Sequence, residues 1–554
     1  MLRILQGFIY SILIFIFTNS VLLSLYYICG FTGIPQNFII FSGVISFVIS
    51  ILINQFILKF KLHYHLIWLI LLLLISIISW RFSEPFYDTS YDGQAYQAEG
   101  IIAIAEYYNP YYDELTTEDL SKFNWVINDY TKVQWYTPAV IYAFTNSLES
   151  VKLINFIMLF TTFFATILIA KKIELGWGLS ILIGILVCIN PVVIYQIMSL
   201  YIDVQVYFFI ILTVYFLLNI YNEPSRFNWF MFSILSVLFI NIKLSAIAFL
   251  AIFVLGFYFI FINKYPNSDI MQMLKSGLLI FILGMLFIGF NPYITNTIKY
   301  GNPLAIVMGD KSSQVLNLNT PKEMRDSIPS SFRWLVSILS VSENNRGNSE
   351  RKETYSLKIP FTIQYGEEKA FLDNNTKIGG LGPLFGGIFI LAVVSLVLKI
   401  ISQSYSLQEI TIIMFTLIAS VAIISAGNTA RFVPQLYLVP IIIIIYLIST
   451  SSKIYYKFIA IIMSLLMLYN SYFVANAYFP KYFEENRELT EDLLSLKSKL
   501  GDTNQNYDVN FGYFLSTRKK IADLDINYTM INDNDCITYK RYLRHTEARF
   551  CNLK

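Results

Sequence analysis

The sequence predicts an all-α polytopic membrane protein with about thirteen membrane spans, exterior loops and a small exterior α/β segment at the C-terminus. Three observations predict this class. The 554 residues are 56% hydrophobic and only 14% charged, whereas soluble domains carry about 25% charged residues. The mean hydropathy is +0.57. The charges stand between long apolar runs. These observations exclude a water-soluble enzyme, a nucleic-acid binder and a disordered scaffold, and predict membrane lipids as partners.

The apolar runs predict the spans. A helix needs roughly 20 residues to cross a bilayer core, and the runs that approach this length are 4–28, 38–58, 66–80, 152–170, 177–197, 204–221, 228–242, 244–262, 276–291, 383–400, 409–426, 435–449 and 458–475. The first run is long and is followed closely by the second. We therefore expect it to be a mature helix and not a cleaved signal peptide.

Basic residues in the short connections predict the orientation, because cytoplasmic turns are enriched in Lys and Arg. If the N-terminus with Arg3 is cytoplasmic, the turns on the same side contain Lys59, Lys61, Lys171, Lys172, Arg226, Lys264, Lys275, Lys399, Lys453 and Lys457. The opposite short turns hold little beyond Lys243 and Arg431. This asymmetry predicts a cytoplasmic N-terminus, and an odd number of spans then puts the C-terminus outside.

Three long polar segments then lie outside: a first loop 81–137, a second loop 292–382 and the tail. We expect a transmembrane domain 1–475 and an exterior C-terminal domain 476–554. Cys536 and Cys551 lie in this tail, where an oxidising compartment favours a disulfide bond worth about 3 kcal/mol. No cysteine or histidine has the spacing of a metal site.

The first loop carries the strongest functional signal. Glu84, Asp88, Asp92 and Glu99 follow the third apolar run closely, and carboxylates near the membrane are costly unless they are solvated or paired. A solvated acidic loop is the plain alternative. Gly93 permits a tight turn into a following helix, and capping of that helix is the structural alternative for Asp92.

The stretch DGQAY, residues 92–96, together with the long first loop and the many spans joined by short turns, resembles the GT-C superfamily of integral-membrane glycosyltransferases. The motif is similar to that of the lipid A aminoarabinose transferases and the protein O-mannosyltransferases. Here Gly93 occupies their second acidic position, and two further spans precede the loop where those relatives have one. The resemblance implies an inverting transfer of a sugar from a polyprenyl-phosphate carrier to a glycan, lipid or protein acceptor, in cell-surface glycan synthesis. It also implies that this transfer occurs on the exterior face of a bacterial inner or plasma membrane.

This chemistry needs a base and a phosphate-binding cation. Asp92, with Asp88 beside it, is the candidate catalytic base for an acceptor hydroxyl. Arg431 is the candidate for the carrier phosphate, because an arginine stays charged and donates two parallel hydrogen bonds. Lys243 is the second candidate cation. The plain alternatives are headgroup contact for Arg431 and a simple turn position for Lys243.

Three more residues are candidate substrate-binding residues. Asp203 lies at the exterior end of a predicted span, at the same predicted surface, and we expect it to pair with a cation, hold a hydroxyl or ligate a divalent metal with Asp88 or Asp92. Tyr96 belongs to the resemblance motif, and Arg333 lies in the second loop. The tail carries no catalytic motif. No cofactor is certain: a divalent metal stays open, and the lipid-linked sugar is a substrate.

Two alternatives stay open. A lipid-linked oligosaccharide polymerase or ligase shares the topology and differs in its acceptor. A transporter or flippase would instead place charges or broken helices near mid-membrane in two matching halves. For the glycosyltransferase we expect Asp92, Asp203 and Arg431 to converge on one exterior cavity that opens sideways to lipid.

Overall fold

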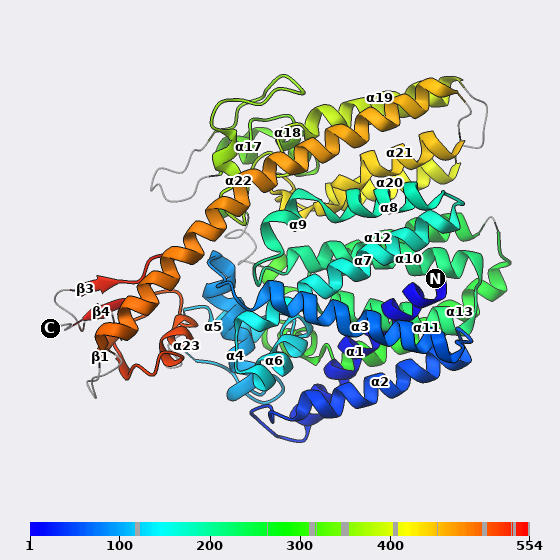
Figure 1. Ribbon diagram of the computed structural model, residues 1–554. Coiled ribbons are helices and arrows are strands. Elements are labelled where there is room, and N and C mark those ends of the chain that lie inside the picture. Colours follow the sequence, from blue (N-terminus) through cyan, green and yellow to red (C-terminus); the bar gives the residue numbers. More distant parts are fainter. Residues whose placement is uncertain are drawn as a thin grey trace.

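The structure is a computed structural model that describes residues 1–116, 122–262, 264–309, 316, 318–344, 354–402, 408–450, 453–500, 507–532, 535 and 539–551. Most of the chain forms helices that pack side by side, and a small sheet follows at one end (Figure 1). The mostly helical membrane class and the small C-terminal sheet predicted from the sequence are therefore confirmed.

Seven helices are long and apolar enough to cross a membrane among the residues described. They are α1 Leu2–Ile28, α2 Phe38–Phe56, α3 Leu62–Ser83, α7 Leu153–Lys172, α10 Asp203–Asn222, α19 Phe385–Ser402 and α22 Ile454–Leu500. A bent pair, α13 Asn267–Phe287 followed by η4 Phe290–Ile294 and α14 Thr295–Tyr300, turns through 80° and makes an eighth candidate.

The remaining apolar helices are shorter: α8 Trp177–Cys188, α11 Arg226–Ile240, α12 Ala246–Phe261, α20 Gln408–Ala422 and α21 Leu438–Thr450. Each of the thirteen predicted apolar runs thus contains a helix. Because only seven meet the length and composition of a complete span, a count of about thirteen crossings stays a prediction.

The polar segments contain several short helices among their described residues. The first loop and its return contain η1 Gly93–Gln97, α4 Ala98–Glu106, α5 Asn124–Asp129, α6 Val133–Thr145 and η3 Glu149–Lys152, and α9 Pro191–Gln196 precedes α10. The second loop contains α15 Ala305–Met308, α17 Lys322–Ser327, η5 Ser330–Phe332, α18 Arg333–Ile338 and η6 Glu367–Phe371. Before α21 come η7 Ala430–Phe432 and η8 Pro434–Tyr437.

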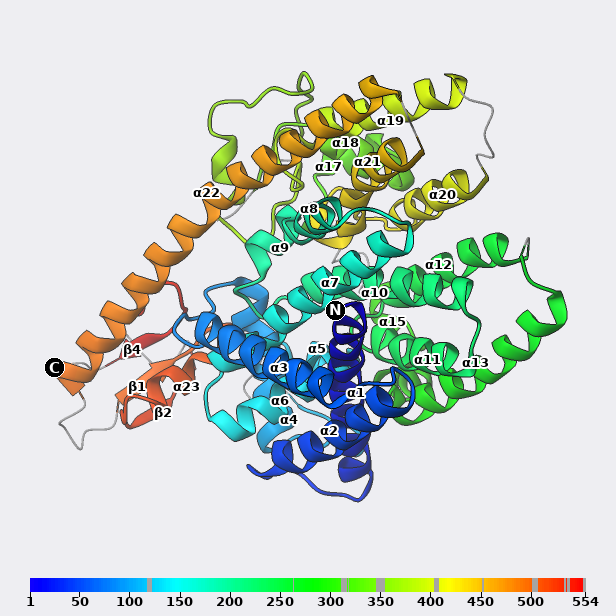
Figure 2. The ribbon, with the colours of Figure 1, turned by 45° about the vertical axis from the view of Figure 1, so that its right-hand side comes forward.

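Two groups of helices meet in the bundle. Figure 2 shows α19, α21 and α22 together near α8, away from α1, α2 and α11. Helix α12 packs on α20 where Gly256 faces Thr416: a Cβ on this glycine would lie 2.0 Å from Thr416 Oγ1. The missing side chain therefore allows the close approach of the two helices.

We call one end of the bundle the loop end. It carries the two long polar segments and the C-terminal sheet, and the N-terminus lies toward the opposite end (Figure 1). At that opposite end, Lys264 Nζ donates to the carbonyl of Tyr221 at 2.8 Å, and Lys399 Nζ donates to the carbonyl of Thr450 at 3.2 Å. Basic side chains of the short turns thus satisfy helix C-termini there.

Helix α22 carries the C-terminal domain away from the bundle (Figure 1). Its 47 residues span about 70 Å, roughly twice the thickness of a bilayer core. The helix runs without a break through the predicted domain boundary at 475/476. Its far part buries Leu489, Leu493 and Leu496, spaced for one helix face, against the sheet.

The sheet has four short strands in the order β2-β1-β4-β3. Strand β1 Tyr507–Asn510 pairs parallel with β2 Tyr528–Met530 and antiparallel with β4 Arg549–Cys551, which pairs antiparallel with β3 Tyr539–Tyr542. Helix α23 Thr517–Ala522 connects β1 to β2. Cys551 is disulfide-bonded, and Cys29 and Cys188 are free. The predicted partner, Cys536, lies outside the described residues.

Candidate functional site

Four charged side chains from four distant segments meet at the loop end. The Nη1 atom of Arg431 lies 2.7 Å from Asp92 Oδ2 and 3.3 Å from Asp203 Oδ2. The Nζ atom of Lys243 donates to Asp203 Oδ1. We call these four residues the ion array. It contains two carboxylates and two cations, so its formal charge balances, which is what burial of the side chains requires.

Each member stands where a helix begins or a turn connects two helices. Asp203 is the first residue of α10, where a carboxylate also interacts favourably with the positive end of the helix dipole. Lys243 lies in the turn between α11 and α12, and Arg431 lies in η7. Asp92 precedes η1 without making a side-chain capping bond. Its carboxylate contacts Arg431. Capping of the helix, which was the structural alternative for Asp92, is not observed.

The guanidinium of Arg431 is enclosed by aromatic rings. Its Cζ atom lies 4.9 Å from the ring centre of Tyr201 and 4.7 Å from that of Phe432, and Lys243 Nζ lies 4.7 Å from the same Phe432 ring. Burial alone lowers the pKa of a guanidinium, but Asp92 and Asp203 outweigh burial and hold the pKa of Arg431 well above its ordinary value. Both ion pairs use Nη1, and the buried Nε has no hydrogen-bond partner. Arg431 therefore keeps donor capacity for an anion.

Tyrosines surround the ion array. Burial raises the pKa of Tyr96, Tyr130 and Tyr201, and nearby carboxylates raise it further. All three phenols are therefore neutral hydrogen-bond donors at physiological pH. The sequence predicted Tyr96 at the site but missed the other two. Tyr201 stands two residues before Asp203, and this closeness in sequence could have indicated that Tyr201 lies at the site.

Asp88 has a different environment from Asp92. Its two carboxylate oxygens accept the backbone N–H groups of Ser90 and Leu200, both at 2.8 Å. Its own N–H donates to Glu149 Oε2 at 2.9 Å. Burial raises the pKa of Asp88. These bonds attach the first loop to the segment before α10, so the contacts of Asp88 are those of a structural residue. The predicted catalytic role gains no support from them.

The position of the Asp88 carboxylate requires a glycine at residue 93. A Cβ at this position would lie 2.0 Å from Asp88 Oδ2 and 2.3 Å from Ser90 Oγ. The glycine that replaces the second acidic residue of the resemblance motif therefore makes room for the bonded Asp88 carboxylate. A larger side chain here would displace Asp88 from its backbone partners.

We predict that Gly93→Ala lowers the free energy of unfolding by about 1–3 kcal/mol, the usual cost of overpacking a closed site. Thermal unfolding of the purified full chain measures this effect. Gly43→Ala in α2 is the matched control, because nothing lies within 4 Å of a Cβ built there. Equal melting temperatures for Gly93→Ala and the wild type would contradict the role of Gly93.

Arg333 is held by backbone carbonyls. Its Nε, Nη1 and Nη2 donate to the carbonyls of Ile328, Ser425 and Arg325 at 3.1, 2.8 and 3.1 Å. The side chain is buried and fixes the second loop on the segment that leads to Arg431. The predicted contact of Arg333 with substrate is therefore not supported by its hydrogen bonds. Its position is structural.

The sequence analysis left three roles open for Asp203: pairing with a cation, binding a hydroxyl and ligating a metal. The structure shows the first of them. It contacts Lys243 and Arg431, and Asp92 turns to the same guanidinium. Within the described part of the chain, no group of three or more His, Cys, Asp or Glu residues could hold a metal ion. The metal-ligand role of Asp203 stays a prediction.

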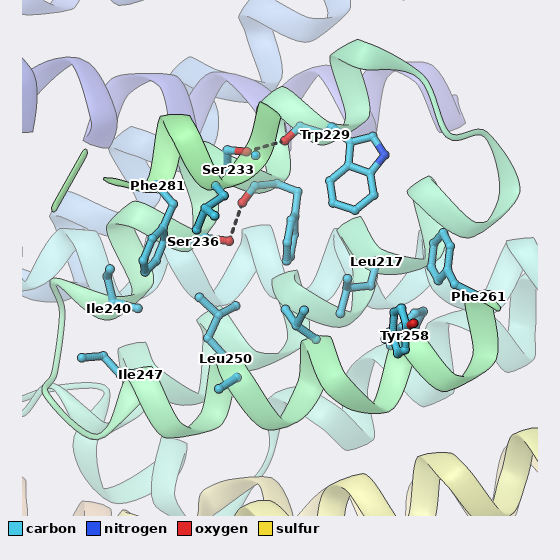
Figure 3. A pocket seen from close by; sticks show the side chains of 16 residues that line it. Leu217, Trp229, Ser233, Ser236, Ile240, Ile247, Leu250, Tyr258, Phe261 and Phe281 are labelled. Carbon is cyan, nitrogen blue, oxygen red and sulfur yellow. Dashed lines mark hydrogen bonds between the residues drawn. The ribbon is translucent and has the colours of Figure 1, made fainter. Parts of the chain in front are cut away.

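An apolar cleft of about 280 Å³ lies between α11, α12 and α13 (Figure 3). Ile240 and Ile247 line one end of the cleft and Phe261 lines the other (Figure 3). The hydroxyls of Ser233 and Ser236 donate to backbone carbonyls of their own helix, so the lining is apolar despite them. A second apolar cavity of about 420 Å³ lies between α12, α20 and α21. The ion array lines neither, so the predicted cavity around it is not among these two.

Compared with models of protein families and with curated proteins, the sequence has no match. The GT-C resemblance therefore stays a prediction from the sequence.

Proposed function

We propose that the protein is a glycosyltransferase of the GT-C kind, which moves a sugar from a polyprenyl-phosphate carrier to an acceptor hydroxyl at the loop end of the bundle. The ion array carries this proposal. It joins a carboxylate, Asp92, to a permanently charged guanidinium, Arg431, at 2.7 Å. These are the two groups that such a transfer needs, and they come from positions 339 residues apart.

The proposed reaction has one proton transfer and one exchange of bonds. The acceptor hydroxyl gives its proton to Asp92 while its oxygen forms a bond to the anomeric carbon of the sugar. The bond between that carbon and the carrier phosphate breaks, and the phosphate leaves with the electron pair. Attack from the side opposite the phosphate inverts the anomeric carbon.

Arg431 stabilises the leaving phosphate in this scheme. Its unpartnered Nε is one free donor, and its charge persists near the low-dielectric edge of the membrane. Lys243 keeps Asp203 neutralised when Arg431 turns toward the phosphate. The neutral phenols of Tyr96, Tyr130 and Tyr201 are available to donate to sugar hydroxyls.

The cleft between α11, α12 and α13 supports a lipid-linked donor. Ile247, at one end of the cleft, is four residues beyond Lys243, and α12 begins between them at Ala246. A phosphate held near Lys243 and Arg431 would therefore leave its apolar chain beside an apolar cleft. A water-soluble sugar nucleotide has no apolar chain that could occupy this cleft.

The proposed function requires the loop end to lie outside the membrane. Thirteen crossings, with the loop end outside, would place the predicted basic turns in the cytoplasm, as the positive-inside rule expects. The contacts of Lys264 and Lys399 support this arrangement, because both lie at the opposite end from Arg431. The acceptor is then a hydroxyl compound outside the membrane.

We expect cells that lose the chain to accumulate a polyprenyl-phosphate sugar and to lack that sugar in the surface glycan. Mass spectrometry of lipid extracts and of released glycans measures both quantities. Re-expression of the wild-type chain is the control and should reverse both changes. If the lipid extract and the glycan are the same with and without the chain, the proposed function is wrong.

A further inference from the structure

Five aromatic rings from two distant parts of the chain gather beside Asp92. The ring centre of Tyr91 lies 5.4 Å from that of Phe514 and 6.5 Å from that of Phe123, both edge to face. Phe123 lies 5.9 Å from Tyr96 and 6.1 Å from Tyr513. We call these residues the aromatic platform. Three belong to the first loop and two to the C-terminal domain.

Two of the five rings of the platform keep much of their surface open, whereas Phe514 is buried. Tyr91 is 44% exposed and Tyr513 is 45% exposed, although each contacts other rings. Polar groups stand at its rim: Lys122 Nζ lies 4.2 Å from the ring centre of Tyr513, and Glu547 Oε2 accepts the N–H of Tyr513 at 2.6 Å. The platform thus combines apolar ring faces with charged hydrogen-bonding groups.

Direct bonds fix the two halves of the platform to each other. Ser516 Oγ donates to the carbonyl of Gln94 at 2.8 Å, and Gln94 Nε2 donates to the carbonyl of His545 at 3.0 Å. Arg518 binds both oxygens of the buried Glu99 at 2.5 and 2.8 Å. A two-bond pair of this kind has fixed geometry. The platform is therefore preorganised and needs no domain movement to form.

These features fit a carbohydrate. A pyranose has an apolar C–H face that stacks on aromatic rings, and hydroxyls at its edge that bond to carboxylates and ammonium groups. The platform offers both kinds of group, and Tyr91 is adjacent in sequence to Asp92. A bilayer is a poor occupant, because α22 carries the C-terminal domain beyond the end of the bundle (Figure 1).

We infer that the aromatic platform binds the acceptor, and that the acceptor is therefore a glycan chain and not a lipid or a protein. This inference rests on the proposed function for the identity of the bound sugar as acceptor. Stacking on Tyr91 and Tyr513 holds the chain so that its terminal hydroxyl reaches Asp92, while Lys122 and Glu547 contact hydroxyls along the chain.

The test uses the purified full chain in detergent and, as the probe, oligosaccharides of a few sugars released by mild acid from the surface glycan of the host. Calorimetric titration measures Kd. We expect saturable binding by the wild type and at least a tenfold higher Kd for the Tyr91→Ala/Tyr513→Ala double variant, because exposed tyrosines of binding sites contribute on this scale. The Tyr91→Phe/Tyr513→Phe variant keeps the rings and should stay within about threefold of the wild type.

Tyr542→Ala is the matched control, because Tyr542 is 59% exposed on the same domain and outside the platform. Its Kd should equal that of the wild type. Absence of saturable binding by the wild type, or an unchanged Kd for the double alanine variant, would overturn the inference. Asp92→Asn should bind the probe normally, so a failure of the platform and a failure of the catalytic proposal give different results.

Discussion

Replacing Asp92 by Asn should reduce the transferred sugar by about 10² to 10⁴-fold, the usual contribution of a positioned general base. Asparagine has the shape of aspartate, and its oxygen still accepts a hydrogen bond from Arg431. It cannot take a proton from the acceptor hydroxyl. The comparison is a glycan analysis of cells that express wild type and variant at equal protein level.

The control for this variant is Glu84→Gln. Glu84 is an exposed carboxylate of the same loop, so its replacement removes an equal charge without touching the ion array. It should leave the glycan unchanged. The Asp92→Asn chain should also elute as a folded protein in size-exclusion chromatography, because the contacts of Arg431 with Asp203 remain. A normal glycan from Asp92→Asn would show that Asp92 is not the base.

Much of the helical architecture follows from composition alone. An apolar run long enough to enter a bilayer forms a helix there, since the backbone has no other way to satisfy its hydrogen bonds. All thirteen predicted runs contain helices for this reason. Their ends were less predictable. Helix α22 continues from a predicted span into the tail, because its polar part buries Leu489, Leu493 and Leu496 against a sheet formed later in the chain.

Part of the site was also predictable. Asp92, Asp203 and Arg431 were expected to converge because each stands at the same end of an apolar run, and the order of the runs fixes which ends share a surface. The sequence predicted that Asp203 could pair with a cation, but not that Arg431 contacts both Asp92 and Asp203. It also could not show that Asp88 is held by backbone N–H groups, because one of them belongs to Leu200, 112 residues away.

The second polar segment shows the same limit. An arginine in a polar loop is a candidate for binding an anion. The N–H groups of Arg333 instead donate to three backbone carbonyls, and one of these belongs to Ser425 in another segment. The docking of the C-terminal domain through Arg518 and Glu99 joins residues 419 positions apart. No local pattern encodes such partners, since they depend on how the helices pack.

Replacing Arg431 by Lys should reduce transfer by about 10² to 10³-fold, the scale on which one preorganised donor to a developing anion contributes. Lysine keeps the positive charge beside Asp92 and Asp203, so the chain should still fold. It has a single nitrogen, which cannot bind two carboxylates and a phosphate with the fixed geometry of a guanidinium. The lysine variant is therefore more informative than a neutral one, because removing the charge would leave the Asp92 carboxylate without its ion-pair partner and Asp203 with Lys243 alone.

The same glycan analysis measures this variant, and its lipid extract should show the unused carrier-linked sugar accumulating. Arg81→Lys is the matched control: Arg81 is exposed at the end of α3, and its guanidinium carbon lies 5.3 Å from the ring centre of Trp80. Arg81→Lys also replaces a guanidinium by an ammonium group and keeps the positive charge, but it lies outside the ion array. Sugar transfer by this variant should therefore be normal. If Arg431→Lys and Arg81→Lys both transfer sugar at the wild-type rate, a positive charge alone is enough at position 431 and the two-bond contact with phosphate must be abandoned.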